Sequence, residues 1–219
     1  MAKQHFSHVD TWVFDLDNTL YDPATRLFDQ IEPRMTDWVM RVTGATRAEA
    51  DVLRRTYWRE HGTTLAGLMR EHGVDPHEYL HDVHQIDFSV LSVDPELRHH
   101  ITALPGRKIV YTNGSAPYAE NVLAARGLSN LFDAIYGVEH AGFHPKPDAA
   151  AFEAVFARDG VAPERGAMFE DDPRNLKVPH DLGMATILVA PKPEPAPHIH
   201  HHTSNLSQFL GTIIAPATA

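Results

Sequence analysis

The sequence predicts an α/β protein built on a doubly wound parallel sheet, with an all-helical cap inserted after the first strand. Three observations predict this fold. Five short runs are almost continuously apolar, as strands are when helices cover both faces of a sheet. Helical stretches alternate with these runs, which is the βαβ pattern of a parallel sheet. One long stretch after the first run shows helical spacing of apolar residues and no strand-like run.

The strands and helices of the predicted sheet can be followed along the chain. The five predicted strands are residues 11–15, 108–112, 134–138, 167–171 and 186–189. The predicted helices between them include residues 117–126, 148–158 and 174–182. Residues 190–197 are rich in proline, lysine and glutamate, so we expect an extended surface loop there, followed by a last helix near residues 206–210.

Residues 21–91 differ from the rest of the chain. Apolar residues recur there at helical spacing, at Leu27, Ile31, Met35, Trp38 and Val39. Further helices are predicted over residues 47–61 and 64–72, and another begins at Asp75. A structureless loop of this length is uncommon in a compact domain. We therefore predict an α/β core of residues 1–20 and 92–219, and a helical cap of residues 21–91.

Composition excludes several classes of function. The 219 residues contain no cysteine, which rules out disulfides, cysteine-ligated metal sites and a cysteine nucleophile. The formal charge of −10 argues against general nucleic-acid binding, which needs a basic face. An anionic small molecule remains compatible with this charge, because a metal ion can reverse the field locally. No apolar run reaches the roughly 20 residues of a membrane helix, and the first residues lack a signal segment, so we expect a cytoplasmic protein, either a monomer or a homodimer.

Two carboxylates follow the first predicted strand, at Asp15 and Asp17. Ligands bind at the carboxyl ends of strands in open α/β sheets. Aspartate is a poor strand former, and two buried carboxylates cost stability unless a cation or hydrogen bonds receive them. Mg2+ prefers such hard oxygen ligands. The alternative is a pair of aspartates that cap a turn.

Polar groups also lie at the ends of the next three predicted strands. In order, they are Thr112, Asn113 and Gly114, then Lys146 between two prolines, then Glu170, Asp171 and Asp172. Each group alone has a structural interpretation: a turn before a helix, a solvated loop lysine, and an acidic first turn that complements a helix dipole.

Together these groups resemble the four motifs of the haloacid-dehalogenase-like hydrolases. Asp15-Leu16-Asp17-Asn18-Thr19 matches the DxDxT motif, and the other three groups follow in the family's order. The resemblance covers about residues 11–189. It implies that Asp15 is a nucleophile that becomes an aspartyl-phosphate, and that Asp17 protonates the leaving oxygen and later activates water.

The resemblance also assigns the remaining core residues. It implies that Thr112, with Asn113 and Gly114, binds the transferred phosphoryl group and that Lys146 neutralises its charge. It implies a Mg2+ ion held by Asp15, by the backbone carbonyl of Asp17, and by the acidic fourth motif. Asp171 is our predicted direct ligand, with Glu170 and Asp172 holding metal-bound waters; the family pattern supports the pair Glu170 and Asp171 and leaves open which of the two binds directly.

The cap carries a second resemblance. Residues 57–68 are similar to the Tyr-Gly-Thr-Thr-Leu-x-Gly-Leu signature of pyrimidine 5'-nucleotidases in the same superfamily, with His61 in place of the usual tyrosine. This resemblance implies that Arg59, His61 and Thr63 contact the substrate. The structural alternative is that Gly62 ends one helix and Thr63 caps the next.

The predicted function is that of a Mg2+-dependent phosphatase for small phosphorylated metabolites, nucleoside 5'-monophosphates with pyrimidine bases first. Phosphoglycolate or sugar-phosphate hydrolysis and a phosphomutase are the alternatives. A haloacid dehalogenase is disfavoured, because it needs neither a metal nor a leaving-group acid such as Asp17. A signalling receiver domain is disfavoured, because its acidic residues come in a different order and it lacks the helical insert.

Four of the five residues 198–202 are histidines. We interpret this segment as a surface loop rather than a metal site, because no acidic residue or cysteine lies close to it in the sequence.

Overall fold

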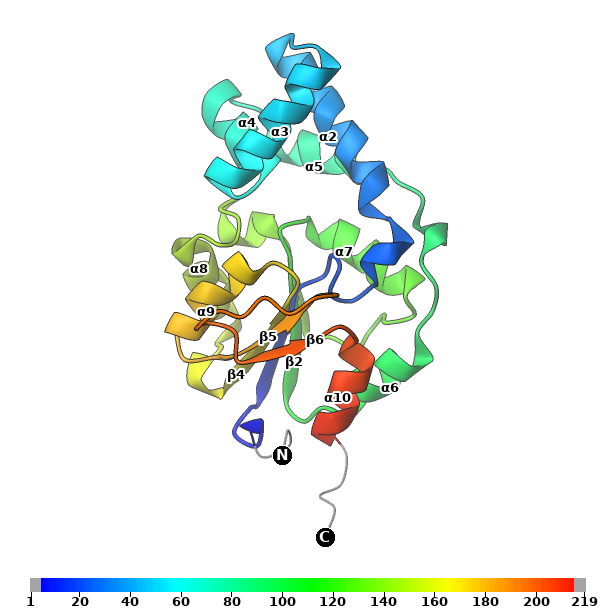
Figure 1. The fold of residues 1–219 in the computed structure, drawn as a ribbon, viewed down its shortest axis with the longest axis vertical. Coiled ribbons are helices and arrows are strands. Elements are labelled where there is room, and N and C mark those ends of the chain that lie inside the picture. The colour runs from blue at the N-terminus through cyan, green and yellow to red at the C-terminus, as the bar shows by residue number, and fades with distance from the viewer. Residues whose placement is uncertain (1–4, 215–219) are drawn as a thin grey trace.

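A computed structural model describes residues 5–214, and within them six parallel strands form a single sheet in the order β3-β2-β1-β4-β5-β6 (Figure 1). The strands are β1 (Thr11–Phe14), β2 (Arg107–Tyr111), β3 (Ala134–Tyr136), β4 (Gly166–Glu170), β5 (Ala185–Val189) and β6 (His201–Thr203). The predicted doubly wound parallel sheet is therefore confirmed. All five predicted strands are present, and the polar last residues of three of them, Asp15, Thr112 and Asp171, lie just beyond the paired segments.

The strand order reverses at β1. The chain moves from β1 to β2 and β3 on one side, and then returns to place β4 on the other side of β1. Such a reversal leaves a crevice outside the carboxyl ends of the two central strands. Asp15 and Asp171 follow directly after these two strands, so the topology alone brings the first and fourth motifs together.

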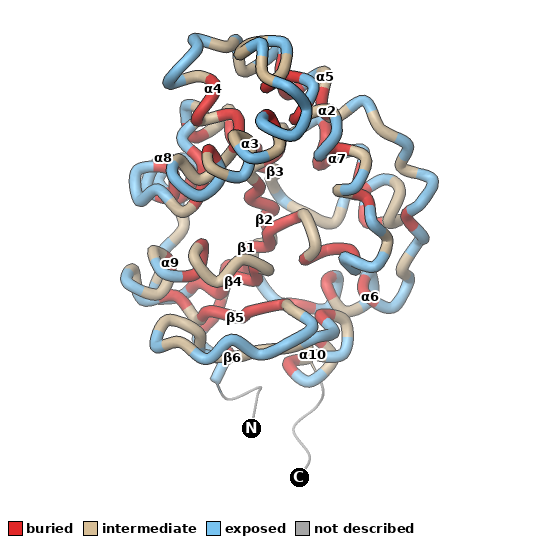
Figure 2. The backbone as a smooth tube through the Cα atoms, turned by 45° about the horizontal axis from the view of Figure 1, so that its top comes forward, coloured by how far each residue is buried: buried red, intermediate tan, exposed pale blue. Residues whose placement is uncertain are grey.

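The central strand is buried along its whole length, and its side chains alternate between two apolar clusters. Trp12 and Phe14 belong to one cluster, in which the Phe14 and Phe169 rings stack with centroids 4.7 Å apart. Val13 belongs to the other cluster, together with Phe152. Figure 2 shows the buried backbone following the inner strands while the outer helices remain largely exposed.

Helices of the sheet region cover both of its faces. They are α6 (Pro95–Ala103), α7 (Ala116–Ala125), α8 (Ala149–Asp159), α9 (Lys177–Asp181) and α10 (Leu206–Ile214). The helix predicted over residues 174–182 is instead a 3-10 turn, Pro173–Leu176, followed by the short α9. Helix α6 was not predicted, although its start carries a signal: the Asp94 side chain accepts from the Leu97 N–H, and Pro95 occupies the first turn.

The histidine-rich segment is only partly a loop: residues 198–200 lie outside helices and strands, but His201 and His202 do not, so the prediction is wrong for those two. His201 and His202 lie in β6, which pairs with β5 at the edge of the sheet. The His200 ring accepts from the Thr186 N–H at 3.1 Å, and the His202 ring lies 2.8 Å from the Ala190 carbonyl oxygen. A run of identical polar residues hides the alternation that normally marks an edge strand, which explains the error.

Of the α-helices between β1 and β2, all but α6 stand together at the opposite end of the molecule from α10 (Figure 1). They are α2 (Phe28–Thr43), α3 (Arg47–His61), α4 (Thr64–His72) and α5 (Pro76–Val83). Their ends carry strong local signals. Thr46 and Glu49 form a capping box at the start of α3, and Gly44 ends α2 with φ of 71°. We keep the term predicted cap for residues 21–91.

No helix within residues 5–214 combines the length and the apolar character needed to cross a membrane.

Candidate active site

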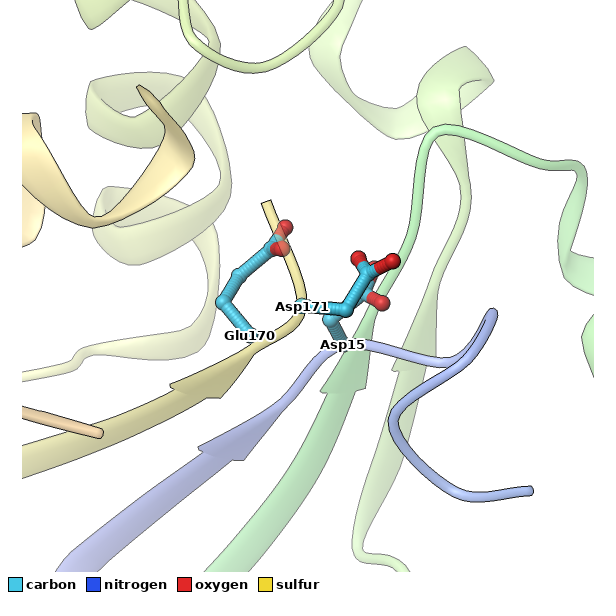
Figure 3. Close-up of side chains that lie close together, drawn as sticks. All are labelled: Asp15, Glu170 and Asp171. Atoms are coloured by element: carbon cyan, nitrogen blue, oxygen red, sulfur yellow. The ribbon is translucent and has the colours of Figure 1, made fainter. Parts of the chain in front are cut away.

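Three carboxylates converge at the ends of the two central strands. Asp15 follows β1, Glu170 is the last residue of β4, and Asp171 comes next. One oxygen from each lies within 4.8 Å of the others. Figure 3 shows the Asp15 and Asp171 carboxylates side by side, with the Glu170 carboxylate directed to the other side of the group.

Lys146 crosses from the third motif to bind these acids. Its side chain is 1% exposed, and Nζ donates to Asp15 Oδ1 at 2.7 Å, to Glu170 Oε1 at 2.7 Å and to the Tyr111 carbonyl at 3.0 Å. These three bonds use all the donors of the ammonium group. The interpretation of Lys146 as a solvated loop residue is therefore wrong. Burial lowers the pKa of Lys146, whereas the two carboxylates raise it. The carboxylates have the larger effect, so the pKa is raised and the ammonium group stays charged.

The second motif holds the lysine loop in place. Asn113 Oδ1 accepts from the Lys146 N–H at 2.8 Å, and Asn113 Nδ2 donates to the Lys146 carbonyl at 3.1 Å. The Gly114 N–H donates to Thr112 Oγ1 at 2.9 Å. A Cβ at Gly114 would lie 2.8 Å from the Tyr118 ring, so a larger residue does not fit there. The side chain of Asn113 thus positions Lys146, a role that the motif alone did not reveal.

Asp17 has a different environment from Asp15. The hydroxyl groups of Tyr118 and Tyr21 both donate to Asp17 Oδ1, at 2.6 and 2.7 Å. Burial raises the pKa of Asp17, and the two tyrosine hydrogen bonds partly oppose this shift. A carboxyl group with a raised pKa holds its proton closer to neutral pH, which suits a general acid. Tyr118 was missed by the sequence analysis, since its link to Asp17 exists only in the folded chain.

The carboxylate cluster fits a hard divalent cation. Asp15 Oδ2 is buried and has no hydrogen-bond partner among residues 5–214. Burial, followed by the charge of Glu170, raises the pKa of Asp15 to about 8 and that of Asp171 to about 9. Lys146 opposes the shift at Asp15. A cation would relieve this repulsion and give the free oxygen a partner.

The hydrogen bonds also distinguish the acids of the fourth motif. Glu170 Oε1 accepts from Lys146 and from Asn175 Nδ2, each at 2.7 Å, and Oε2 accepts from the Asp172 N–H at 2.8 Å. Both oxygens of Glu170 are therefore engaged by the protein. Asp171 receives a bond on Oδ2 from Asn18 at 3.2 Å, which leaves Oδ1 for a metal. This arrangement favours Asp15 and Asp171 as the direct metal ligands.

Asp172 holds an arginine that connects the core with the predicted cap. Its carboxylate pairs with Arg174 at 2.6 Å. The Arg174 guanidinium lies 3.7 Å from the centroid of the Trp58 ring, which belongs to α3. A second contact joins the rings of His77 and Phe143, edge to face at 5.0 Å.

A cavity of about 460 Å³ extends from the carboxylates into the predicted cap. Asp15, Asp17, Thr112 and Lys146 line its core end. The helices line the other end with the apolar side chains of Phe28, Ile31, Met35, Leu65, Leu80 and Val83, and with the polar ones of Glu32, Arg54, Arg55, Thr64 and Tyr79. The site thus has a polar end suited to phosphate and a largely apolar end suited to the rest of a substrate.

Of the three residues of the predicted cap that were expected to bind substrate, one lines this cavity. Thr63 lines it, but its hydroxyl accepts from the Ala66 N–H and caps α4. Arg59 and His61 are not among the described residues that line it. Arg59 is exposed and pairs with Glu60, whereas the His61 ring lies 3.3 Å from Glu71. Both side chains are paired instead with acidic residues that do not line the cavity either.

The inner face of α3 supplies other residues. Arg54, Arg55 and Trp58 line the cavity, as does Gly62 beyond the helix end. Positions 54, 58 and 62 are four residues apart and therefore share one side of a helix. That spacing was the signal available in the sequence.

The nucleotidase-like signature has an architectural role in the cap. A Cβ at Gly67 would lie 2.4 Å from the Tyr57 ring, so the glycine allows α3 and α4 to pack closely. Gly62 has φ of +86°, and its Cβ would lie 3.2 Å from the Lys146 carbonyl oxygen. The junction between α3 and α4, at Gly62 and Thr63, therefore packs against the loop that carries Lys146.

Replacing Lys146 by methionine is expected to lower the free energy of unfolding by about 3–5 kcal/mol, because Asp15 and Glu170 lose a buried partner. Urea unfolding in metal-free buffer measures this change. Lys177→Met is the control: Lys177 forms an exposed pair with Asp181, and its loss should cost less than about 1 kcal/mol. Equal stability of the two variants would contradict a charged Lys146 bridge.

The profile of the haloacid dehalogenase-like hydrolases matches residues 9–183 of the chain. The chain belongs to this family. A curated relative of this haloacid dehalogenase-like hydrolase is Phosphate metabolism protein 8 of Saccharomyces cerevisiae, strain ATCC 204508 / S288c, 26% identical over 197 residues. The match covers 80% of this chain and 60% of the yeast protein, so the chain spans only part of that relative's length.

Solved structures show the same fold. A HAD phosphatase from Thermococcus onnurineus superposes with a TM-score of 0.63 at 17% identity, covering 94% of this chain and 98% of that one. The putative HAD-hydrolase YfnB from Bacillus subtilis bound to magnesium gives 0.60 at 19%, with the same coverages. A 2-haloacid dehalogenase from Pseudomonas syringae pv. Tomato DC3000 gives 0.58 at 22%, again with the same coverages. At these identities the likeness establishes the fold alone.

Proposed function

We propose that this hydrolase is a Mg2+-dependent phosphatase that forms an aspartyl-phosphate on Asp15. The observation that carries the proposal is the contrast between two buried carboxyl groups. Asp15 is bonded by Lys146, whereas Asp17 is held by two tyrosine hydroxyls. Two carboxyl groups in such different environments suit a nucleophile and a general acid–base.

In the first step, an oxygen of Asp15 attacks phosphorus. A new bond forms between Asp15 and phosphorus, the bond from phosphorus to the leaving oxygen breaks, and Asp17 gives its proton to that oxygen. In the second step, Asp17 takes a proton from water, which attacks phosphorus and releases phosphate and the Asp15 carboxylate. Tyr21 and Tyr118 hold Asp17 through one oxygen, which directs the other toward the reacting groups.

Charge on the phosphoryl group is met by residues of this chain. Lys146 keeps one positive charge beside Asp15. Thr112 Oγ1 accepts from the Gly114 N–H, so its own hydrogen is free to donate to a phosphoryl oxygen. Asp15 and Asp171 would hold Mg2+, which when bound supplies further neutralisation of phosphate charge. Alignment and charge stabilisation account for most of the catalysis in such transfers.

Nucleoside 5'-monophosphates are the proposed substrates, those with pyrimidine bases first. The support is the apolar end of the cavity, which can take a flat ring beyond the phosphate. Phosphoglycolate or a sugar phosphate would leave most of that wall uncovered. The resemblance of residues 57–68 to the nucleotidase signature supports the same substrate class, although the signature residues themselves have packing roles.

Dehalogenation is the second candidate, because a 2-haloacid dehalogenase shares the fold. It requires neither a leaving-group acid nor a metal. The buried, tyrosine-bonded Asp17 and the three clustered carboxylates would then have no function. These two features favour phosphoryl transfer.

A substrate panel tests the proposed function. Phosphate release is measured from UMP, CMP, ribose 5-phosphate, phosphoglycolate and p-nitrophenyl phosphate, with Mg2+, with EDTA and with Ca2+. We expect activity with Mg2+, its loss in EDTA, and no rescue by Ca2+, which takes more ligands at longer distances. Halide release from a 2-haloacid in EDTA, without phosphate release from any ester, would establish the dehalogenase instead.

A further inference from the structure

Polar side chains of the predicted cap also line the cavity, namely Glu32, Arg54, Arg55, Thr63, Thr64, Tyr79 and His84, and two of them carry a buried polar atom that has no hydrogen-bond partner among residues 5–214. Arg54 comes from α3 and Tyr79 from α5, and both line the cavity. Their neighbours in the lining include Ile31, Leu80 and Val83. Polar groups in such a wall usually fix the orientation of a ligand.

Tyr79 is 1% exposed, and its hydroxyl has no hydrogen-bond partner among residues 5–214. Its ring packs on Trp38 with centroids 5.5 Å apart. A phenylalanine would make the same packing without burying a hydroxyl, so the free protein gains nothing from the oxygen. The other tyrosine of this helical pair, Tyr57, differs: its hydroxyl lies 3.1 Å from Glu71 and 3.0 Å from His72.

Only part of the Arg54 guanidinium has a hydrogen-bond partner among the described residues. A terminal nitrogen of its guanidinium donates to Glu32 Oε1 at 3.0 Å, whereas the buried Nε–H has no partner among the described residues. The Arg54 charge also acts on the Tyr79 hydroxyl, since it opposes the upward shift that burial causes in the pKa of Tyr79. Burial is the larger effect, so Tyr79 stays protonated and can donate a hydrogen bond into the cavity that Arg54 also lines.

We propose that Arg54 and Tyr79 recognise the leaving group by donating hydrogen bonds to carbonyl oxygens on a flat ring, as a pyrimidine base presents them. This inference rests on the proposed phosphatase function and names the residues that select its substrate. An acyl chain would fill the apolar walls but leave both donors without partners. A bare sugar phosphate would offer hydroxyls but leave the apolar walls uncovered. The ring carbonyls of a pyrimidine satisfy both requirements.

Tyr79→Phe tests the proposal. We expect kcat/KM for UMP to fall about 10-fold, the effect of one lost hydrogen bond, while kcat/KM for p-nitrophenyl phosphate changes less than about twofold. Arg54→Met should lower kcat/KM for UMP by about 10- to 100-fold, because its hydrogen bond carries a charge. The urea midpoint of Tyr79→Phe should equal or exceed that of the wild type, which excludes damage to the fold as the cause.

Tyr57→Phe is the matched control. It removes a hydroxyl from the same group of helices that has partners and lies outside the cavity lining, so the ratio of the two activities should stay at the wild-type value. Equal losses for UMP and p-nitrophenyl phosphate in Tyr79→Phe, or unchanged UMP hydrolysis in both Tyr79→Phe and Arg54→Met, would overturn the proposal.

Binding separates this inference from the proposed function. Calorimetry in EDTA, where no turnover is expected, gives the dissociation constant of UMP for wild type and Tyr79→Phe. A roughly 10-fold weaker affinity of the variant for UMP supports recognition by Arg54 and Tyr79, whether or not either ester is hydrolysed. If neither ester is hydrolysed, only the proposed phosphatase function is refuted. Equal affinities of the two proteins for UMP, or no UMP binding by the wild type, would overturn the inference. The proposed phosphatase function would then still be tested by the hydrolysis of p-nitrophenyl phosphate.

Discussion

Asp15→Asn is expected to lower kcat/KM for every phosphate ester by about 10⁴-fold or more, the scale of losing a covalent nucleophile. The amide cannot attack phosphorus, and it removes one negative charge from the carboxylate cluster. The shape of the side chain is kept, so Lys146 still has a carbonyl acceptor at the same position. Steady-state phosphate release with a sensitive coupled assay measures the effect.

The fold should survive this change, because the buried carboxylates of the cluster repel one another. Asp15→Asn relieves that repulsion, and the urea midpoint in metal-free buffer should not fall by more than that of Asp181→Asn, an exposed control that pairs with Lys177. Sustained multiple turnover by a freshly prepared Asp15→Asn protein, free of deamidated enzyme, would exclude Asp15 as the nucleophile.

Asp17→Asn is expected to lower kcat by about 10²–10⁴-fold, the usual contribution of a general acid–base. The loss should depend on the leaving group. A nucleoside has a poor leaving oxygen that needs the proton, whereas p-nitrophenolate leaves without one. The first step should therefore be damaged far more with UMP than with p-nitrophenyl phosphate, and rapid-quench measurement of the first turnover shows this difference.

The two tyrosines provide a matched comparison for that experiment. Tyr118→Phe removes one of the two bonds to Asp17 and keeps its carboxyl group, so its effect on kcat should be much smaller than that of Asp17→Asn. Equal damage to the first step with both esters in Asp17→Asn would show that Asp17 is not the acid.

The core of the site could be predicted because each motif is a short string that follows a strand of the sheet, directly for Asp15, Thr112 and Asp171, and after a 3-10 turn beyond β3 for Lys146. In a parallel sheet such ends meet at one edge, so the sequence positions of Asp15, Thr112, Lys146 and Asp171 already imply their convergence. Lys146 lies 2.7 Å from both Asp15 and Glu170, and Thr112 and Asp171 line the same cavity, so this convergence is confirmed.

The bonding around the core acids could not be predicted in the same way. Tyr118 lies in a helix about a hundred residues from Asp17, and only the packing of α7 beside the first motif brings its hydroxyl to that carboxylate. Our proposal of Asp171 rather than Glu170 as a direct metal ligand likewise depends on which oxygens already accept hydrogen bonds, since Asn175 and the Asp172 N–H donate to Glu170.

The helices of the predicted cap could be predicted from the sequence, but the face of each helix that lines the cavity could not. Arg59 and His61 lie in the signature-like segment and outside the cavity, whereas Arg54 and Trp58 line it. Tyr79 gave no signal, because an unpartnered hydroxyl is visible only after the surrounding side chains are placed. Strand β6 escaped prediction for a local reason, the uniform polarity of its histidines.

The most direct test of the account is to locate a phosphoryl group on Asp15. Asp17→Asn protein is mixed with p-nitrophenyl phosphate and Mg2+, quenched in acid within the first turnover, digested and analysed by mass spectrometry. An aspartyl-phosphate mechanism predicts one added phosphoryl mass on the peptide that contains Asp15, assigned to that side chain by fragmentation and removed by hydroxylamine. A first-turnover release of p-nitrophenol with no phosphoryl group on the protein, or with the group on another residue, would contradict it.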